Sequence, residues 1–302
     1  MQSVATFVSA AAARALDEET LRRAARILPG SGTIHWLEER VAADLFFEAQ
    51  VTPALEAGLQ RVLADQPIDF FVQPVEGRRK KLLMADMDST VIAQECLDEL
   101  ADFVGFKAHV AAITAQAMRG EIAFEPALRE RVALLEDLPV HVIDTIAAER
   151  ITLTPGAETL VRTMRANGAF TVLVSSGFSA FTRKVAARAG FDADAANELE
   201  IADGKLTGRV EEPILGRIAK RQILDNFCER LRIDRQATLA VGDGANDLDM
   251  LGAAGLSVAY RAKPAVAAAA HARVDHADLT ALLYAQGYRR ADFSLSSSDG
   301  LT

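Results

Sequence analysis

Two carboxylates separated by one residue, Asp86 and Asp88, come directly after a short apolar run, residues 82–85. An apolar run of this length, bounded by charged residues, predicts a strand that is buried on both faces. The strand would deliver Asp86 to the carboxyl edge of a parallel sheet, where open α/β folds bind their ligands. Such a pair suits a divalent cation together with a phosphate group. The alternative is an ordinary strand end that leads into a helix N-cap, where Asp and Ser are common.

Polar residues follow two later apolar runs in the same way. Residues 170–174 lead into Ser175, and residues 238–241 lead into Gly242-Asp243-Gly244-Ala245-Asn246-Asp247. Because parallel strands end at one edge of their sheet, we expect these groups to meet the first pair of carboxylates. Each motif taken singly is also typical of a turn, so the prediction rests on their order and on their shared position at strand ends.

The expected cluster of carboxylates predicts a metal site. Without a cation, four carboxylates in one place would repel one another and raise one another's pKa values. A hard divalent cation removes this conflict, and Mg²⁺ favours oxygen ligands, retained waters and substrate phosphate. We expect Asp86 and Asp243 as side-chain ligands and Asp247 as a ligand or as the holder of a metal-bound water. Asp88 could bind through its backbone carbonyl, which leaves its carboxyl group free.

A phosphate group needs positive partners as well. Ser175 offers a hydroxyl group, and glycine-rich turns bring backbone N–H groups close to an anion. Lys220, near the start of a predicted helix over residues 218–231, could supply a point charge. Without the other motifs, such a lysine is more often a solvated surface residue.

The elements around these motifs predict an α/β fold. Strands alternate with helices after about residue 155, which predicts parallel pairing and right-handed crossovers, with a further buried strand over residues 256–260. From residue 93 to about 139 apolar residues recur at helical spacing, which predicts a helical cap inserted after the first strand. Asp203-Gly204 between alternating residues predicts a hairpin. We expect a main domain over residues 80–285, with its cap at about 93–153.

Residues 1–76 have a different pattern. Two predicted helices, 17–28 and 52–64, and four predicted strands give the order βαββαβ, which is typical of a small ferredoxin-like α+β module. The module holds no cluster of catalytic side chains, so it could be regulatory, could form a homodimer, or could be passively structural. Residues 76–81 are expected to be a charged linker, and residues 290–302 a disordered tail.

Composition narrows the possible functions. The formal net charge of −9 argues against a general nucleic-acid binder, which would carry a basic face. The two cysteines, Cys96 and Cys228, lie far apart and predict buried thiols in a reducing cytoplasm rather than a disulfide or a metal site. The sequence shows neither a signal peptide nor an apolar run long enough to span a bilayer, so a membrane is not an expected partner.

The motifs taken together resemble the four motifs of the haloacid dehalogenase superfamily: Asp86-Met87-Asp88-Ser89-Thr90, Ser175, Lys220 and residues 242–247. The resemblance covers about residues 80–285 and implies the Rossmann-like sheet and inserted helical cap of that family, with Mg²⁺ as cofactor. It also implies an enzyme in which Asp86 is the nucleophile and forms an aspartyl-phosphate. Asp88 would protonate the leaving group and then take a proton from water.

Within the family, the pattern is similar to that of members that hydrolyse O-phospho-L-serine in serine biosynthesis. The likeness includes Glu95 and residues 124–131, and it assigns Glu95 and Arg131 to the amino and carboxylate groups of the substrate. By the same likeness the first module is ACT-like. Met87 and Ser176 depart from the usual pattern, since many relatives have Phe and a second Gly at these positions. The likeness also assigns five residues to binding of the substrate phosphate: Ser175, Ser176, Gly177, Lys220 and Asn246.

Two other functions remain open at this point. One is a phosphatase or phosphotransferase for another small amino-acid phosphate, because Glu95 and Arg131 favour a zwitterion but do not set its length. The other is a binding or sensor protein with vestigial catalysis, against which the complete set of polar groups argues. A nucleotide-binding ATPase and a serine hydrolase are disfavoured, because the chain has no Gly-Lys-Ser/Thr phosphate loop and Ser175 has no Gly-x-Ser-x-Gly context.

Overall fold

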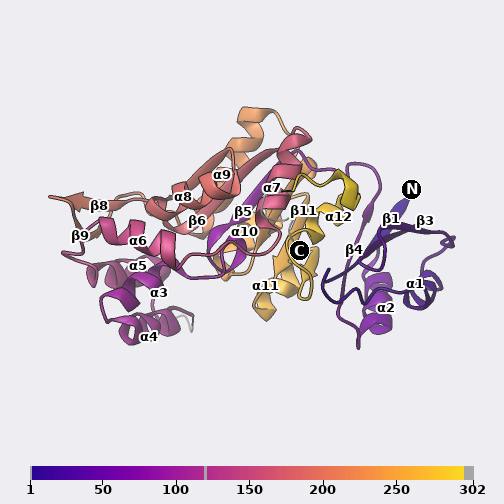
Figure 1. Ribbon diagram of the computed structural model, residues 1–302, viewed down its shortest axis with the longest axis horizontal. Coiled ribbons are helices and arrows are strands. Elements are labelled where there is room, and N and C mark those ends of the chain that lie inside the picture. Colours follow the sequence, from indigo (N-terminus) through magenta and orange to yellow (C-terminus); the bar gives the residue numbers. More distant parts are fainter. Residues whose placement is uncertain (1, 119–120, 296–302) are drawn as a thin grey trace.

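The computed structural model describes residues 2–118 and 121–295. A parallel sheet lies in the middle of the molecule, a helical cap lies at one end and the N-terminal module lies at the other (Figure 1). No helix in these ranges is long and apolar enough to cross a bilayer.

The central sheet has six parallel strands in the order β12-β11-β10-β5-β6-β7. The α/β fold class and the four predicted buried strands are confirmed, whereas β7 and β12 were not predicted. β7 is partly exposed and rich in alanine, and β12 has three residues, so neither carries an apolar run. The strands are β5 (Leu82–Asp86), β6 (Phe170–Phe178), β7 (Ala193–Asn197), β10 (Thr238–Gly242), β11 (Leu256–Tyr260) and β12 (Ala272–Val274).

Helices cover both faces of this sheet, which explains why its inner strands are apolar throughout. Leu82 and Met84 pack on one face against α9 (Arg217–Leu231), α10 (Leu248–Ala253) and α11 (Pro264–Ala269). Leu83 and Ala85 pack on the other against α7 (Ala157–Ala166), α8 (Ser179–Ala189) and α12 (Ala281–Ala285). β5 comes first in this sheet's chain order and pairs with β10 and β6. The strand order therefore reverses at β5, where such sheets place their ligand crevice.

The cap is inserted between β5 and β6, as the periodicity predicted. The chain enters and leaves it side by side, since Ile92 pairs with Leu153 in an antiparallel bridge. Figure 1 shows β8 and β9 beside the cap helices. The cap helices are α3 (Cys96–Phe103), α4 (Lys107–Met118), α5 (Phe124–Ala133) and α6 (His141–Glu149).

A hairpin from later in the chain completes the cap. β8 (Leu199–Ala202) and β9 (Lys205–Val210) are joined by Asp203 and Gly204, both with positive φ. The hairpin itself was predicted, but its position beside α5 was not. Backbone bonds of 3.0 Å and 2.9 Å connect Leu206 to Asp137 and Leu138 at the end of the α5 segment. Such long-range contacts leave no periodic signal in the hairpin sequence.

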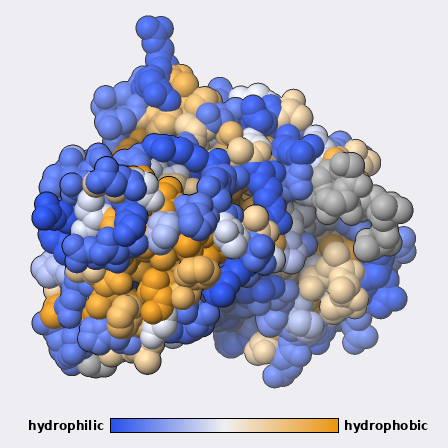
Figure 2. Space-filling view, turned by 60° about the vertical axis from the view of Figure 1, so that its left-hand side comes forward, coloured by the Kyte–Doolittle hydropathy of each residue, from blue (hydrophilic) through white to orange (hydrophobic). Residues whose placement is uncertain are grey.

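The cap carries most of the exposed large apolar side chains in the described ranges. Phe103 is the last residue of α3, Phe106 lies between α3 and α4, and Ile201 lies in β8. Figure 2 shows apolar groups gathered among hydrophilic ones on the half of the molecule that comes forward in this view.

The N-terminal module has the predicted order βαββαβ. Its four strands form an antiparallel sheet in the order β2-β3-β1-β4. Asp17 and Thr52 cap the two helices with their side chains, and Pro53 occupies the first turn of the second helix, as expected. The elements are β1 (Ser3–Ser9), α1 (Glu18–Ala25), β2 (Ile34–Glu38), β3 (Ala42–Phe47), α2 (Pro53–Leu63) and β4 (Ile68–Pro74).

Buried polar contacts join this module to the main domain. The Arg78 guanidinium, 9% exposed, donates to both carboxylate oxygens of Asp44 at 2.7 Å and to the carbonyl oxygens of Tyr284 and Ala285. The Asp69 carboxylate accepts the backbone N–H groups of residues 275–277. Arg78, within the predicted charged linker, is therefore buried, and it has partners on both sides of the interface.

Residues 290–295, expected to begin a disordered tail, are folded. Arg290–Asp292 form a helical turn, and the ring of Phe293 packs on Tyr284 with centroids 5.0 Å apart. The Ser294 N–H donates to the Thr163 hydroxyl group at 2.9 Å. Burial of the Phe293 ring holds this segment, so the expectation is wrong for it. The rest of the expected tail, residues 296–302, lies outside the described residues.

We expect Arg78→Ala to lower the free energy of unfolding by about 3–5 kcal/mol, because the Asp44 carboxylate would remain buried without its cation. Arg22→Ala is the matched control, since it removes an exposed ion pair with Glu18 within α1. The control should change the free energy by about 0.5 kcal/mol or less. Urea unfolding of both variants measures the difference, and equal midpoints would show that the Arg78 contact adds no stability.

Candidate active site

Three strand ends meet at the carboxyl edge of the central sheet. β5 ends at Asp86, β6 contains Ser175 and Asp243 follows β10. The chain turns sharply after β5, since Ser89 has the left-handed φ of 55° that few residues other than glycine adopt. The turn brings Asp88 back beside β6, where its carboxylate contacts the Ser175 hydroxyl group at 2.9 Å.

Lys220 of α9 lies fully buried between two of the carboxylates. Its Nζ donates to Asp86 Oδ1 at 2.5 Å and to Asp247 Oδ1 at 2.7 Å. Burial alone would lower the pKa of Lys220, but Asp247 and Asp86 more than offset it and hold the pKa above its usual value. The lysine is therefore a fixed positive charge and not the solvated residue that its helix position alone would indicate.

Asp86, Asp243 and Asp247 form a compact group of carboxylates. One oxygen from each lies within 4.8 Å of the others. Burial and the charge of Asp247 raise the pKa of Asp86 well above its usual value, and the same two causes raise that of Asp243 to about 6. The raised values report uncompensated negative charge that a cation would relieve. A donor set made only of carboxylate oxygens fits a hard divalent cation such as Mg²⁺.

The Asp88 carboxylate lies outside that group and has its own partners. Its Oδ1 accepts the backbone N–H of Cys96, at the start of α3, at 2.8 Å. Its Oδ2 accepts the Ser175 hydroxyl group, and the Ser175 oxygen in turn accepts the Gly177 N–H at 2.8 Å. These contacts fix Asp88 between β5, β6 and the first cap helix, α3. Its carboxyl group is not part of the group formed by Asp86, Asp243 and Asp247.

Glycines make room for these side chains. A Cβ atom at Gly242 would lie 2.4 Å from Asp247 Oδ2, and one at Gly244 would lie 2.3 Å from Asn246 Oδ1. A Cβ atom at Gly177 would lie 3.0 Å from the Ser175 oxygen. The glycines at the ends of β6 and β10 thus allow a close approach of polar side chains that a Cβ atom would obstruct.

Asn246 and Ser176 complete the phosphate side of the predicted set. Asn246 Nδ2 lies 3.5 Å from the Ser176 hydroxyl oxygen. The backbone carbonyl oxygen of Ser176 accepts the Asn197 side-chain N–H at 2.8 Å. β7, which ends at Asn197, therefore supports the turn after Ser175 although its sequence gave no sign of this role.

Glu95 lies beside the turn after β5, where the cap begins. Its Oε1 accepts the Ser89 hydroxyl group at 2.6 Å. Burial and the nearby charge of Asp88 raise the pKa of Glu95 to about 7. A carboxylate of this kind gains from a cationic partner, because both causes disfavour its charged form.

Arg131, the remaining predicted residue, lies near the end of α5 in the cap. Its Nε donates to the Ala127 carbonyl oxygen at 3.0 Å, and its Nη1 donates to the Thr114 hydroxyl group at 3.2 Å. Burial lowers the pKa of Arg131, while the charges of Asp98 and Glu95 oppose this effect. The structure thus brings predicted residues together at the sheet edge, whereas the hydrogen bonds of Arg131 are to other cap residues.

Two residues near the site were not predicted. The Thr90 hydroxyl group donates to Asp243 Oδ1 at 3.3 Å, and its place beside the two carboxylates in the sequence could have indicated this. The Lys263 N–H donates to the Asp243 carbonyl oxygen at 3.3 Å, and the Lys263 charge opposes the rise in the Asp243 pKa. Lys263 precedes α11, and nothing in its spacing marked it.

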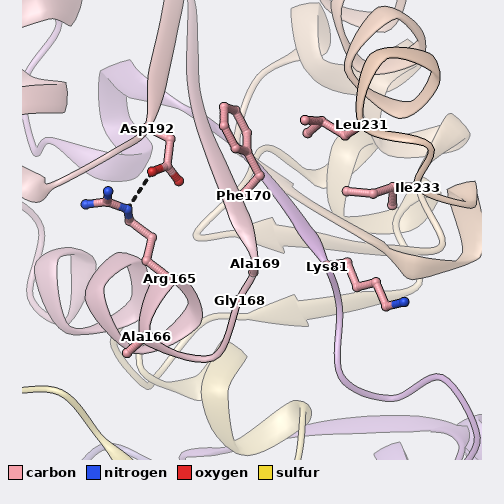
Figure 3. Close-up of a pocket in the computed structure, with 9 residues that line it drawn as sticks. All are labelled: Lys81, Arg165, Ala166, Gly168, Ala169, Phe170, Asp192, Leu231 and Ile233. Atoms are coloured by element: carbon pink, nitrogen blue, oxygen red, sulfur yellow. Dashed lines mark ion pairs between the residues drawn. The ribbon is translucent and has the colours of Figure 1, made fainter.

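One hollow in the described structure lies away from these residues. It has a volume of about 660 Å³ and is lined by Lys81, before β5, and by Phe170, at the start of β6. Figure 3 shows it beside the ion pair of Arg165 and Asp192, whose closest atoms are 2.7 Å apart. It is therefore at the amino ends of the strands, opposite the edge where such sheets bind ligands, and it holds none of the predicted site residues.

The parallel sheet, its inserted cap and the carboxylate group at its edge define a capped, Rossmann-like α/β domain with a candidate metal site. The family model of haloacid dehalogenase-like hydrolases matches residues 83–252, which is more than half of the chain. The chain belongs to this family.

Known proteins resemble this chain both in sequence and in fold. The chain is 42% identical over 246 residues to a phosphoserine phosphatase of Mycobacterium tuberculosis, covering 81% of the chain and 60% of that relative. A crystal structure of a haloacid dehalogenase family hydrolase from Salmonella enterica is 30% identical, with a TM-score of 0.85, covering 94% and 97% of the two chains. A structure described as a phospho-aspartyl intermediate analogue of phosphoserine phosphatase is 40% identical, with a TM-score of 0.64, covering 68% and 98%.

We expect MgCl₂ to raise the melting temperature of this protein, because a ligand that binds only the folded state stabilises it. At about 100 times the dissociation constant the gain would be about 2.7 kcal/mol. Asp243→Asn should lose most of this rise, since it removes one of the three carboxylates. The control Asp65→Asn, at an exposed position in the N-terminal module, should keep the rise. A full rise in Asp243→Asn would place the cation elsewhere.

Proposed function

We propose that this protein is a Mg²⁺-dependent phosphoserine phosphatase, which hydrolyses O-phospho-L-serine to L-serine and phosphate as the last step of serine biosynthesis. The observation that carries the proposal is that Asp86 and Asp88 have different surroundings. Asp86 belongs to the carboxylate group with Lys220, while Asp88 is held apart by Cys96 and Ser175. The names of the relatives described above support the choice of substrate.

In the first step, a carboxylate oxygen of Asp86 attacks phosphorus and the bond from phosphorus to the serine oxygen breaks. Asp88 gives its proton to the departing oxygen, because a serine alkoxide is a poor leaving group. In the second step, Asp88 takes a proton from water, whose oxygen attacks the phosphorus of the aspartyl-phosphate. The products are inorganic phosphate and the original Asp86 carboxylate.

Lys220 and the metal would stabilise the negative charge of the transferring phosphoryl group. Lys220 lies against Asp86 at 2.5 Å, so its charge is in place before the phosphate arrives and costs no reorganisation. Asp86, Asp243 and Asp247 would hold Mg²⁺ with their side chains, and Asp88 would do so with its backbone carbonyl. When bound, the cation supplies further positive charge to the transferring phosphoryl group.

The remaining predicted residues would bind the two ends of the substrate. The phosphate would be held by Ser175, Ser176, Gly177, Lys220 and Asn246. Glu95 would pair with the ammonium group and Arg131 with the carboxylate, which Arg can bind through two parallel hydrogen bonds. The homodimer through the N-terminal module and the cytoplasmic location stay predictions.

Asp86→Asn should abolish phosphate release from O-phospho-L-serine, because an amide keeps the shape of the side chain but is a far weaker nucleophile. Acid quenching of the parent with radiolabelled substrate should trap label on the protein, and the variant should trap none. Asp144→Asn, an exposed change in the cap, is the control and should behave as the parent. Turnover by Asp86→Asn at the parental rate would exclude Asp86 as the nucleophile.

The pKa of Glu95 near 7 predicts a pH dependence for the amino-acid part of the substrate. Above this value Glu95 is charged and can pair with the ammonium group, so kcat/KM for phosphoserine should rise as the pH increases through about 7. The substrate phosphate itself titrates near pH 6. The useful quantity is therefore the ratio of kcat/KM for phosphoserine to that for p-nitrophenyl phosphate, which has no ammonium group.

Glu95→Gln should flatten this ratio across the same range, because glutamine keeps the shape but has no charge to gain. If the variant kept the parental slope, the pH dependence would belong to another group and the role of Glu95 would be withdrawn.

A further inference from the structure

The guanidinium of Arg131 is held by two neutral acceptors from different helices. The Ala127 carbonyl oxygen lies on its own helix, α5, and the Thr114 hydroxyl group lies on α4. These contacts use two of the five N–H donors that an arginine carries. A single contact to its own helix, from Nε, would leave the planar group free to turn about that hydrogen bond. The second contact, from another helix, fixes the orientation of the plane.

Carboxylates are near Arg131 but do not pair with it. The charges of Asp98 and Glu95 act on the guanidinium. Within the described ranges, however, no ion pair joins Arg131 to either of them. Other cap cations do form such pairs: Arg129 lies 2.7 Å from Glu212, and Arg150 lies 2.9 Å from Asp102. Neutral anchoring thus keeps the charge of Arg131 uncompensated at short range and leaves three N–H donors for an incoming anion.

We propose that Thr114 is a positioning residue for specificity: its hydroxyl group holds Arg131 in the orientation that meets the carboxylate of the substrate. The inference rests on the proposed function, since it concerns how that site reads the amino acid. Thr114 does not touch the reacting atoms. Its effect is to reduce the rotamer freedom that a long arginine side chain would lose on binding, which lowers the cost of forming a two-bond contact.

The test uses the full-length protein and two substrates, O-phospho-L-serine and p-nitrophenyl phosphate. Thr114→Val removes the hydroxyl group and keeps the shape of the side chain, and Thr114→Ser restores a hydroxyl group. Thr114→Ala is a second loss variant with a better helix former, in case valine perturbs α4. Thr145→Val is the matched control, because the hydroxyl group of this exposed cap threonine donates to the His141 carbonyl oxygen of its own helix and to no other described residue.

We expect Thr114→Val and Thr114→Ala to lower kcat/KM for phosphoserine by about tenfold relative to the value for p-nitrophenyl phosphate, as loss of one hydrogen bond to a charged group would. Thr114→Ser should recover most of the ratio, and Thr145→Val should keep the parental ratio. Equal losses on both substrates, with a lower melting temperature and no rescue by serine, would show that the contact only joins α4 to α5.

A double-mutant cycle with Arg131→Ala separates this inference from the proposed function. In the Arg131→Ala background, Thr114→Val should have no further effect on the ratio, because the group that it positions is gone. A parent that fails to hydrolyse phosphoserine would overturn the proposed function. A parent that hydrolyses it, an Arg131→Ala that loses selectivity and a Thr114→Val that does not would overturn only the role of Thr114.

Discussion

The buried contact of Lys220 with Asp86 and Asp247 is the constraint on which the site depends. Burial and neighbouring carboxylates raise the pKa values of Asp86 and Asp243, and the fully buried lysine compensates part of this negative charge. Removing one member would leave its partners buried and unpaired, which is far more costly than losing an exposed ion pair. α9 is therefore bound to the ends of β5 and β10 by charge as well as by apolar packing.

This arrangement is possible because the strand order reverses at β5. β10 and β6 flank β5, so the polar groups that follow these three strands lie next to one another although they are far apart in the chain. Gly242 and Gly244 then allow Asp247 and Asn246 to fold back against the strand end at distances that a Cβ atom would block. The same edge thus combines rigid strands with turns that side chains can approach closely.

The sequence indicated this edge well, because a buried parallel strand has an apolar run and a polar end, and both are visible without a structure. It did not indicate what surrounds the edge. The complete burial of Lys220 depends on α9 packing against β5, and the burial of Arg78 depends on Asp44 and on residues 284–285. The contact of the β8–β9 hairpin with α5 is of the same kind. Each is a pairing between distant segments, and local spacing carries no information about such pairings.

The part of the substrate that each group contacts also determines which groups can select among phosphate esters. In the proposed function, the groups at the sheet edge would meet the phosphate and the reacting oxygen, which every phosphate ester shares. They would therefore speed the reaction of many esters without telling one from another. A choice among esters needs groups that meet the remainder of the substrate, and a site that pairs with a charged group rejects substrates that lack it. In the proposed function those groups are Glu95 and Arg131 of the cap. Burial and the charge of Asp88 raise the pKa of Glu95, and neutral anchors hold Arg131. Catalysis and selectivity are therefore held by different parts of the fold, and the cap can change its substrate without disturbing the buried lysine on which the chemistry depends.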